Sequence, residues 1–255
     1  MEIRLVLSNE VNKIEELFQA VYDRSQGIAY WEWCFRAFHG YTAMGCFEGN
    51  KLVSYYASIL LKEGAITYSS MTHPEYRGKG FYTKVALALY DVLSKYRDWC
   101  CFYANQNIYD LHITMGNIEA CQVKEYRIPF DKSNRLLVLG NPFEWKDPFW
   151  EWRFKDHPFE KERKYLKFYD QDFFNFYEDR VQILNYEDLN RAIRIGMYLA
   201  SITDKKEISF WSEKELDYPY ILIPQWKMYR ALNDNTDIFK VIMNDTIRMW
   251  QHDGF

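Results

Sequence analysis

Hydrophobic and polar positions repeat with two different periods in the first half of the chain. Apolar side chains recur at helical spacing over residues 9–24 and 81–96, so each segment presents one apolar face. Runs rich in β-branched and aromatic residues predict strands at residues 1–8, 42–47, 51–61 and 65–72. Glu48-Gly49-Asn50 separates the second and third runs and predicts a hairpin turn. This alternation of strands and helices is typical of a mixed α+β fold.

The second half of the chain repeats this pattern more weakly. Strand-like runs lie at residues 166–169, 180–185 and 207–211. Apolar residues at helical spacing predict a helix over residues 187–202, between the last two runs. Residues 220–224 and 238–250 are expected to complete this second unit.

The segment between the predicted strand 65–72 and the predicted helix 81–96 carries the candidate chemistry. Its sequence is His73-Pro74-Glu75-Tyr76-Arg77-Gly78-Lys79-Gly80-Phe81-Tyr82. Backbone N–H groups at a helix start lack intrahelical partners, and glycines let an anion approach them closely. The segment therefore predicts a phosphate site. Neither a Gly-x-x-x-x-Gly-Lys-Ser/Thr P-loop nor a Gly-x-Gly-x-x-Gly fingerprint is present, which argues against ATP or a dinucleotide.

This segment resembles the acetyl-CoA-binding motif of the GNAT superfamily of N-acetyltransferases, Arg/Gln-x-x-Gly-x-Gly/Ala. Arg77 and Gly80 occupy its fixed positions, and Tyr82 stands where glycine or alanine is usual. The family's downstream pattern, Asn-x-x-Ala-x-x-Leu-Tyr-x-x-x-Gly-Phe, is in register with Asn105, Ile108, Leu111, His112, Gly116 and Asn117. The resemblance covers residues 1–130 and implies a central mixed, mostly antiparallel sheet flanked by helices.

The resemblance also implies roles for individual residues. Contacts to acetyl-CoA, as cosubstrate, are expected from Ser70, Met71, Thr72, Arg77, Gly78, Lys79, Gly80, Phe81 and Tyr82. Tyr82 either crowds the pyrophosphate or turns outward from the helix. His112 stands where the family has a tyrosine that protonates the departing CoA thiolate, and an imidazolium donates a proton near neutral pH. Asn105 is expected to orient a water or the pantetheine amide.

The family has no fixed position for the general base that takes the proton of the attacking amine. Four residues are candidates by chemical type and are not ranked by the sequence: Glu32, His39, Glu63 and Tyr103.

An aromatic motif occurs twice. Tyr30-Trp31-Glu32-Trp33-Cys34-Phe35-Arg36 recurs as Phe149-Trp150-Glu151-Trp152-Arg153-Phe154-Lys155, at an offset of 119 residues. We expect a tandem arrangement, with an acetyl-CoA-binding domain over residues 1–130 and a degenerate GNAT-like domain over residues 131–255. The second helix start, at residues 185–189, has two acids and no glycine, which disfavours a pyrophosphate. The alternative is a chance repeat within one elaborated domain. Core packing is the expected role of the tryptophans.

Composition narrows the class of protein. With 255 residues, of which 48% are hydrophobic, the chain can bury a large core. Its net charge of -4 argues against a nucleic-acid partner. The five cysteines have no Cys-x-x-Cys spacing, so neither a metal site nor a disulfide framework is indicated, and a reducing cytoplasm is expected. No signal-peptide pattern or membrane-spanning run is present, so no membrane partner is expected.

The expected activity is that of an acyl-CoA-dependent N-acetyltransferase, which transfers acetyl from acetyl-CoA to a primary amine of a small molecule. Analogy with similar-looking bacterial tandem proteins suggests an amino sugar. Two alternatives stay open. One is a non-catalytic ligand- or partner-binding protein with a closed pyrophosphate site. The other is an aminoacyl-tRNA-dependent peptidyltransferase, against which the match at Arg77 and Gly80 speaks. The sequence does not determine the oligomeric state.

Overall fold

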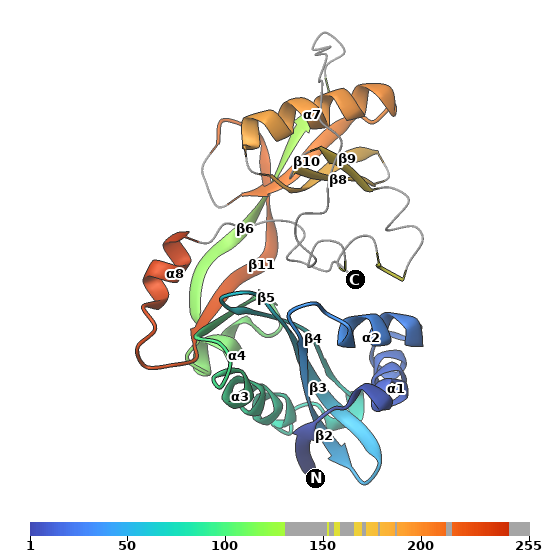
Figure 1. Ribbon diagram of the computed structural model, residues 1–255, viewed down its shortest axis with the longest axis vertical. Coiled ribbons are helices and arrows are strands. Elements are labelled where there is room, and N and C mark those ends of the chain that lie inside the picture. Colours follow the sequence, from blue (N-terminus) through green and yellow to red (C-terminus); the bar gives the residue numbers. More distant parts are fainter. Residues whose placement is uncertain are drawn as a thin grey trace.

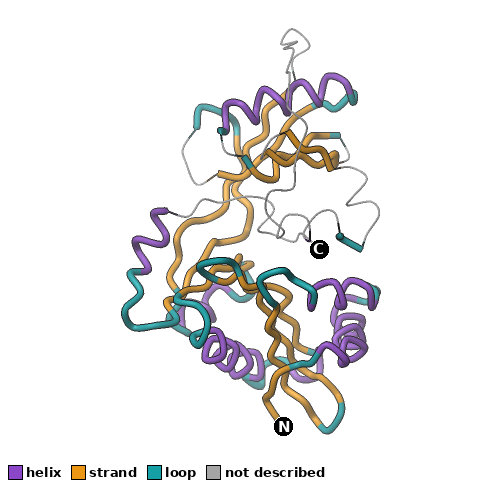
Figure 2. The backbone as a smooth tube through the Cα atoms, in the orientation of Figure 1, coloured by secondary structure: helices purple, strands orange, loops and turns teal. Residues whose placement is uncertain are grey.

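The computed structural model describes residues 1–130, 152, 156–158, 166–169, 172–177, 179–186, 188–212 and 216–244. Within this part of the chain, eleven strands form one sheet in the order β1-β2-β3-β4-β5-β11-β6-β10-β9-β8-β7 (Figures 1 and 2). The strands are β1 Glu2–Leu5, β2 Tyr41–Glu48, β3 Lys51–Leu60, β4 Ala65–Thr72, β5 Trp99–Asn105, β6 Ile118–Pro129, β7 Leu166–Tyr169, β8 Asp172–Tyr177, β9 Arg180–Asn185, β10 Glu207–Ser212 and β11 Tyr220–Ala231.

The α-helices are α1 Val11–Tyr22, α2 Ile28–Phe35, α3 Phe81–Leu93, α4 Tyr109–Thr114, α7 Leu189–Ile202 and α8 Ile238–Asn244. Two short 3₁₀ turns, η1 Ser8–Glu10 and η2 Pro74–Tyr76, precede α1 and α3. None of the helices in the described residues is both long and apolar enough to cross a membrane.

The N-terminal half is a layered unit. Strands β1 to β4 lie side by side and are antiparallel, with the expected hairpin closing where Glu48 pairs with Lys51. Helices α1 and α2 cover one face of these strands and α3 covers the other (Figure 1). The predicted apolar faces are the buried ones: Ile14, Leu17 and Phe18 of α1 pack in one core, and Val85 and Leu89 of α3 in another. The strands and helices predicted in this half are therefore confirmed.

Strand β11 joins the two halves of the chain. It is longer than the predicted run at 220–224, and it lies between β5 and β6, antiparallel to both. Strand β6 in turn pairs with β10 of the C-terminal half. The expected domain boundary at residue 130 directly follows the end of β6. The hydrogen-bonded sheet continues across this boundary, because β11 of the C-terminal half pairs with β5 and β6, and β6 of the N-terminal half pairs with β10.

The strand order is similar when read outward from the β6–β11 pair. On one side, β4 and β5 are parallel and are connected through α3; on the other, β9 and β10 are parallel and are connected through α7. Strands β3 and β4 are antiparallel, as are β8 and β9. The two halves thus share a local topology around a central strand pair.

The repeated tryptophan motif makes a reciprocal contact. The indole N–H of Trp33 donates to the backbone carbonyl of Trp152 at 3.0 Å, and the indole N–H of Trp152 donates to the carbonyl of Trp33 at 3.0 Å. Their rings stack with centroids 4.5 Å apart and planes at 11°. Trp31 is also buried and donates its indole N–H to the Glu15 carboxylate at 2.7 Å. The expectation that Trp31, Trp33 and Trp152 are packing residues is confirmed. Trp150 lies outside the described residues.

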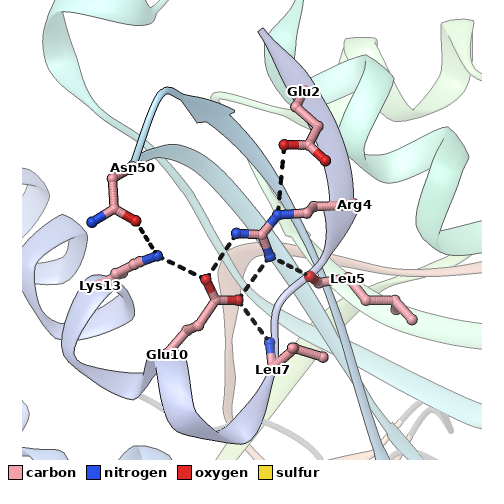
Figure 3. Close-up of polar contacts among 7 residues, drawn as sticks. All are labelled: Glu2, Arg4, Leu5, Leu7, Glu10, Lys13 and Asn50. Carbon is pink, nitrogen blue, oxygen red and sulfur yellow. Dashed lines mark hydrogen bonds and ion pairs between the residues drawn. The ribbon is translucent and has the colours of Figure 1, made fainter.

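A polar cluster fixes the edge strand β1 to the start of α1 (Figure 3). The guanidinium of Arg4 donates to both carboxylate oxygens of Glu10 at 2.8 Å and to the carbonyl of Leu5 at 2.9 Å. Glu10 also accepts from the backbone N–H of Leu7 and from Lys13. Because the cluster occupies the carbonyl of Leu5 and the N–H of Leu7, it leaves the strand edge less available to another strand.

Trp33→Phe keeps an aromatic ring in the stack but removes the donor to the Trp152 carbonyl. We expect the free energy of unfolding to fall by about 1–3 kcal/mol, because the buried carbonyl loses its partner. Urea denaturation followed by circular dichroism measures the loss. Trp152→Phe should cost a similar amount, and the double variant less than their sum. Trp226→Phe, at a half-buried ring, is the control. An unchanged stability in both single variants would show that the reciprocal bonds contribute nothing.

The pH dependence of stability tests the Glu10 cluster. Hydrogen bonding from Arg4 lowers the pKa of Glu10 against a smaller opposing effect of burial. The unfolded chain therefore binds the proton first as pH falls. The stabilisation that ionised Glu10 gives the folded state is complete above the pKa of this carboxyl in the unfolded chain. It is lost as pH falls through the lower pKa of Glu10 in the folded state. Glu10→Gln should lower the free energy of unfolding by about 1 kcal/mol at pH 7, with a difference that shrinks below pH ~4. The exposed Glu16→Gln is the control, and a difference independent of pH would contradict this role.

Candidate functional site

An opening between two parallel strands defines the candidate site. Strands β4 and β5 pair only at their beginnings, where Ala65 faces Cys100 and Ile66 faces Cys101. Beyond these pairs β4 stays with β3, and β5 stays with β11 along its full length. The two strands therefore diverge, and their later residues present main-chain groups toward each other without a shared ladder. An extended ligand can hydrogen-bond to such edges.

A bulge accompanies the divergence. Across the β3–β4 pair the register shifts between Tyr55/Met71 and Ala57/Tyr68, so Ser69 and Ser70 together face one residue of β3. Ser69 has φ of 55°, a left-handed conformation that costs a non-glycine residue about 1–2 kcal/mol. A bulge bends its strand, and this one lies in the part of β4 that has left β5.

The three cofactor-contact residues predicted on β4 are Ser70, Met71 and Thr72, and their side chains have different surroundings. Met71 is buried and packs in the core under α1 and α2, so its side chain is directed away from the glycine loop. The hydroxyl of Thr72 lies 3.0 Å from that of Ser54, and its carbonyl accepts from the Arg77 guanidinium at 3.2 Å. Ser70 is half-buried beside the opening.

The glycine loop forms an open cradle at the start of α3. Gly78 and Gly80 have φ of 71° and 73°, and Gly80 is the N-terminal cap of α3. No side chain caps this helix, and a Cβ added at either glycine would meet nothing within 4 Å. The first N–H groups of α3 therefore face open space at the positive end of the helix dipole. This is the geometry that binds a phosphate group.

Two lysines, Lys79 in the glycine loop and Lys84 on the first turn of α3, lie near the cradle in the chain. The Lys79 ammonium donates to the carbonyl of Glu75 at 2.8 Å and lies 5.1 Å from the Tyr76 ring centroid. Lys84 lies 5.9 Å from the Phe81 ring centroid. These cations add positive potential beside the helix start without filling the loop.

Tyr82 turns inward, not outward from the helix. Its ring lies 5.5 Å from that of Tyr56, and its hydroxyl oxygen lies 2.9 Å from Nε2 of His112. Burial raises the pKa of Tyr82 well above its usual value, with smaller effects from Tyr56 and Ser70. The phenol is therefore protonated at neutral pH. The side chain points away from the open side of Gly78 and Gly80, toward α4.

His112 is brought to the site, but in a different form from the one expected. Its side chain is fully buried, and burial, with a smaller effect of Arg230, lowers its pKa to about 4. At neutral pH the imidazole is thus uncharged, and the proposed imidazolium acid is not the form that this environment favours. The ring nitrogen Nδ1 lies 3.1 Å from the side-chain nitrogen of Asn117.

Asn105 stands at the end of β5 and is exposed. Its side-chain oxygen accepts from the N–H of Asn107 at 3.0 Å, and its carbonyl accepts from the N–H of Ile108 at 3.2 Å. These bonds form the turn that leads into α4. The expected role in orienting a water or an amide stays a prediction.

The four candidate bases occupy different places. Tyr103 lies on the part of β5 that has diverged from β4, with its ring 5.7 Å from that of Trp211. Glu63 is at the opposite end of β4, in the turn before Ala65, where it lines a separate surface cavity with Arg97 and Asp98. Glu32 is exposed on α2, and His39 is half-buried after it. Of the four, Tyr103 is the one on the diverged part of β5, with its ring packed against Trp211 of β10.

The corresponding helix start in the second half is closed. The Asp188 carboxylate caps α7 by accepting from the N–H of Arg191 at 3.1 Å. Strands β9 and β10 pair over four successive residues, from Arg180/Glu207 to Ile183/Phe210. In the described residues, α7 therefore offers neither an open glycine cradle nor a comparable divergence of strands.

Comparison of the structure with solved proteins shows which fold this is. Superposition on a conserved protein of unknown function from Enterococcus faecalis V583 covers 91% of this chain and 72% of the other, with a TM-score of 0.69 and 12% identity. A GCN5-related N-acetyltransferase from Anabaena variabilis gives a TM-score of 0.63 at 14% identity and covers 91% and 73% of the two chains. A GCN5-related N-acetyltransferase from Kribbella flavida gives 0.63 at 11%, with 91% and 72% covered.

Sequence comparison alone does not find these similarities. No protein-family model matches the sequence, and a comparison with curated proteins gives no significant match. The fold similarity rests on the arrangement of helices and strands over nine-tenths of the chain. The chain has the mixed α+β fold of the GNAT superfamily of N-acetyltransferases.

Proposed function

We propose that the protein is an N-acetyltransferase that uses acetyl-CoA and transfers acetyl to a primary amine of a small molecule. The observation that carries the proposal is the open, uncapped start of α3 beside the divergence of β4 from β5. A pyrophosphate in the cradle and a pantetheine arm along β4 would place a thioester between the two strands. Coenzyme A is extended and anionic at one end, and it fits both features.

The chemistry needs a neutral amine near the thioester carbonyl, donors to the developing oxyanion and a proton for the leaving sulfur. The unpaired edges of β4 and β5 supply main-chain donors. Tyr103 is our candidate to accept the proton of the amine, directly or through water, because it lies on the part of β5 that has diverged from β4. For the acceptor we retain an amino sugar as the specific candidate, on analogy alone.

We further propose that residues 131–255 derive from a second GNAT-like unit that has lost cofactor binding. The reciprocal contact of Trp33 with Trp152, at the offset of the sequence repeat, supports this reading. So does the closed start of α7. In this proposal the second unit supports the first through β11 and does not bind acetyl-CoA. A reducing cytoplasm remains the proposed location, and the described cysteines are free thiols.

Calorimetric titration with acetyl-CoA and with free CoA tests the cofactor. We expect binding in the micromolar range by the wild-type protein, and at least a ~100-fold loss in Gly80→Glu, because a carboxylate would enter the cradle where phosphate charge must lie. Gly49→Glu is the matched control: it too replaces a glycine of positive φ with open space around its Cα, but in the β2–β3 hairpin. No binding at millimolar CoA, or equal loss in both variants, would overturn the proposal.

A further inference from the structure

A chain of polar contacts runs from β11 to α3 and ends beside the opening. Nη1 of Arg230 donates to the carbonyl of Met115 at 2.6 Å and lies 3.5 Å from Oδ1 of Asn117. The Asn117 amide nitrogen donates to the carbonyl of His112 at 2.9 Å and faces Nδ1 of its ring. Nε2 of His112 then meets the hydroxyl of Tyr82. Arg230 of β11, Asn117 in the turn before β6 and His112 of α4 thus form a series of contacts that ends at the phenol of Tyr82.

The chain determines which nitrogen of His112 carries the proton. Because Arg230 has only donors, Oδ1 of Asn117 must face it, and the Asn117 amide N–H groups must face His112. Nδ1 is therefore an acceptor, and the uncharged ring carries its proton on Nε2. That N–H donates to the Tyr82 oxygen, so the hydroxyl proton of Tyr82 is directed elsewhere. Hydrogen bonding with Tyr56 on β3 and with Ser70 on β4 also acts on the Tyr82 hydroxyl.

The position of Tyr82 puts its hydroxyl on the expected path of a bound thioester. Tyr82 is the second residue of α3, directly after the cradle, and its hydroxyl lies between α4 and the bulged part of β4. A thioester that follows the edge of β4 from the cradle passes this hydroxyl. The leaving thiolate needs a proton there. Uncharged His112 has no proton on Nδ1, and its Nε2 proton is donated to the Tyr82 oxygen.

We propose that Tyr82 is a catalytic residue that gives its hydroxyl proton to the departing thiolate, and that His112, held by Asn117 and Arg230, is its positioning residue. This inference rests on the proposed acyl transfer. The neutral amine forms a bond to the thioester carbonyl carbon, and the C–S bond then breaks with its electron pair on sulfur. Sulfur takes the proton of Tyr82. The phenolate, stabilised by the Nε2–H bond, recovers a proton from the amine nitrogen through solvent.

Kinetic measurements separate this role from packing. Thiol release from acetyl-CoA is followed with hydroxylamine as the probe nucleophile, after subtraction of the uncatalysed rate. Tyr82→Phe should lower kcat at least ~100-fold and change the calorimetric Kd for CoA less than ~3-fold. His112→Gln keeps a side-chain N–H for the Tyr82 oxygen and should retain more activity than His112→Leu. Tyr55→Phe, which removes a buried phenol that bonds to Tyr41 in the core under α1 and α2, is the control.

Nuclear magnetic resonance provides a readout that needs no acceptor. The ring nitrogens of His112 should show the Nε2–H tautomer at pH 7 and no protonation down to about pH 5, because the pKa of His112 is lowered to about 4. A protonated or Nδ1–H ring at pH 7 would overturn the inference. So would Tyr82→Phe with wild-type kcat, or with binding lost in proportion to turnover. Failure of the wild-type protein to bind acetyl-CoA would overturn the proposed function itself.

Discussion

The position of β11 is the constraint on which the candidate site depends. A parallel strand pair that separates after two residues leaves both strands with an open edge, and β5 would be poorly fixed if β4 were its only neighbour. Strand β11 pairs with β5 from Trp99 to Asn105 and so holds it in place while β4 bends away. The wall of the opening is therefore stabilised by a strand that lies more than one hundred residues later in the chain.

The same strand carries a polar group into the N-terminal half. Arg230, near the end of β11, reaches the carbonyl of Met115 and the side chain of Asn117. Asn117 holds the buried imidazole of His112 in one tautomer, and His112 meets Tyr82. Burial makes the charged imidazole unfavourable, and the nearby guanidinium adds to that effect. The C-terminal half thus influences the electrostatics of the site through hydrogen bonds, in addition to supporting the sheet.

The tryptophan contact joins equivalent positions of the repeated aromatic motif, Trp33 and Trp152. Each indole N–H needs an acceptor when it is buried, and each motif supplies the backbone carbonyl that its counterpart uses. A reciprocal arrangement of this kind is expected of two similar segments that face each other across an approximate two-fold axis. It agrees with the similar order of strands on the two sides of the β6–β11 pair, and it supports our proposal of two related units.

The sequence by itself determined the local structure of the N-terminal half. The apolar periods of α1 and α3, the turn at Glu48-Gly49-Asn50 and the glycines before Phe81 act over a few residues, so their consequences can be predicted without knowing the fold. The tertiary structure decided the rest. The insertion of β11, the inward turn of Tyr82, the burial of His112 and the pairing of Trp33 with Trp152 all depend on groups far apart in the chain. Strand order and the charge state of a buried ring are set by which distant neighbours exclude water, and no local pattern contains that information.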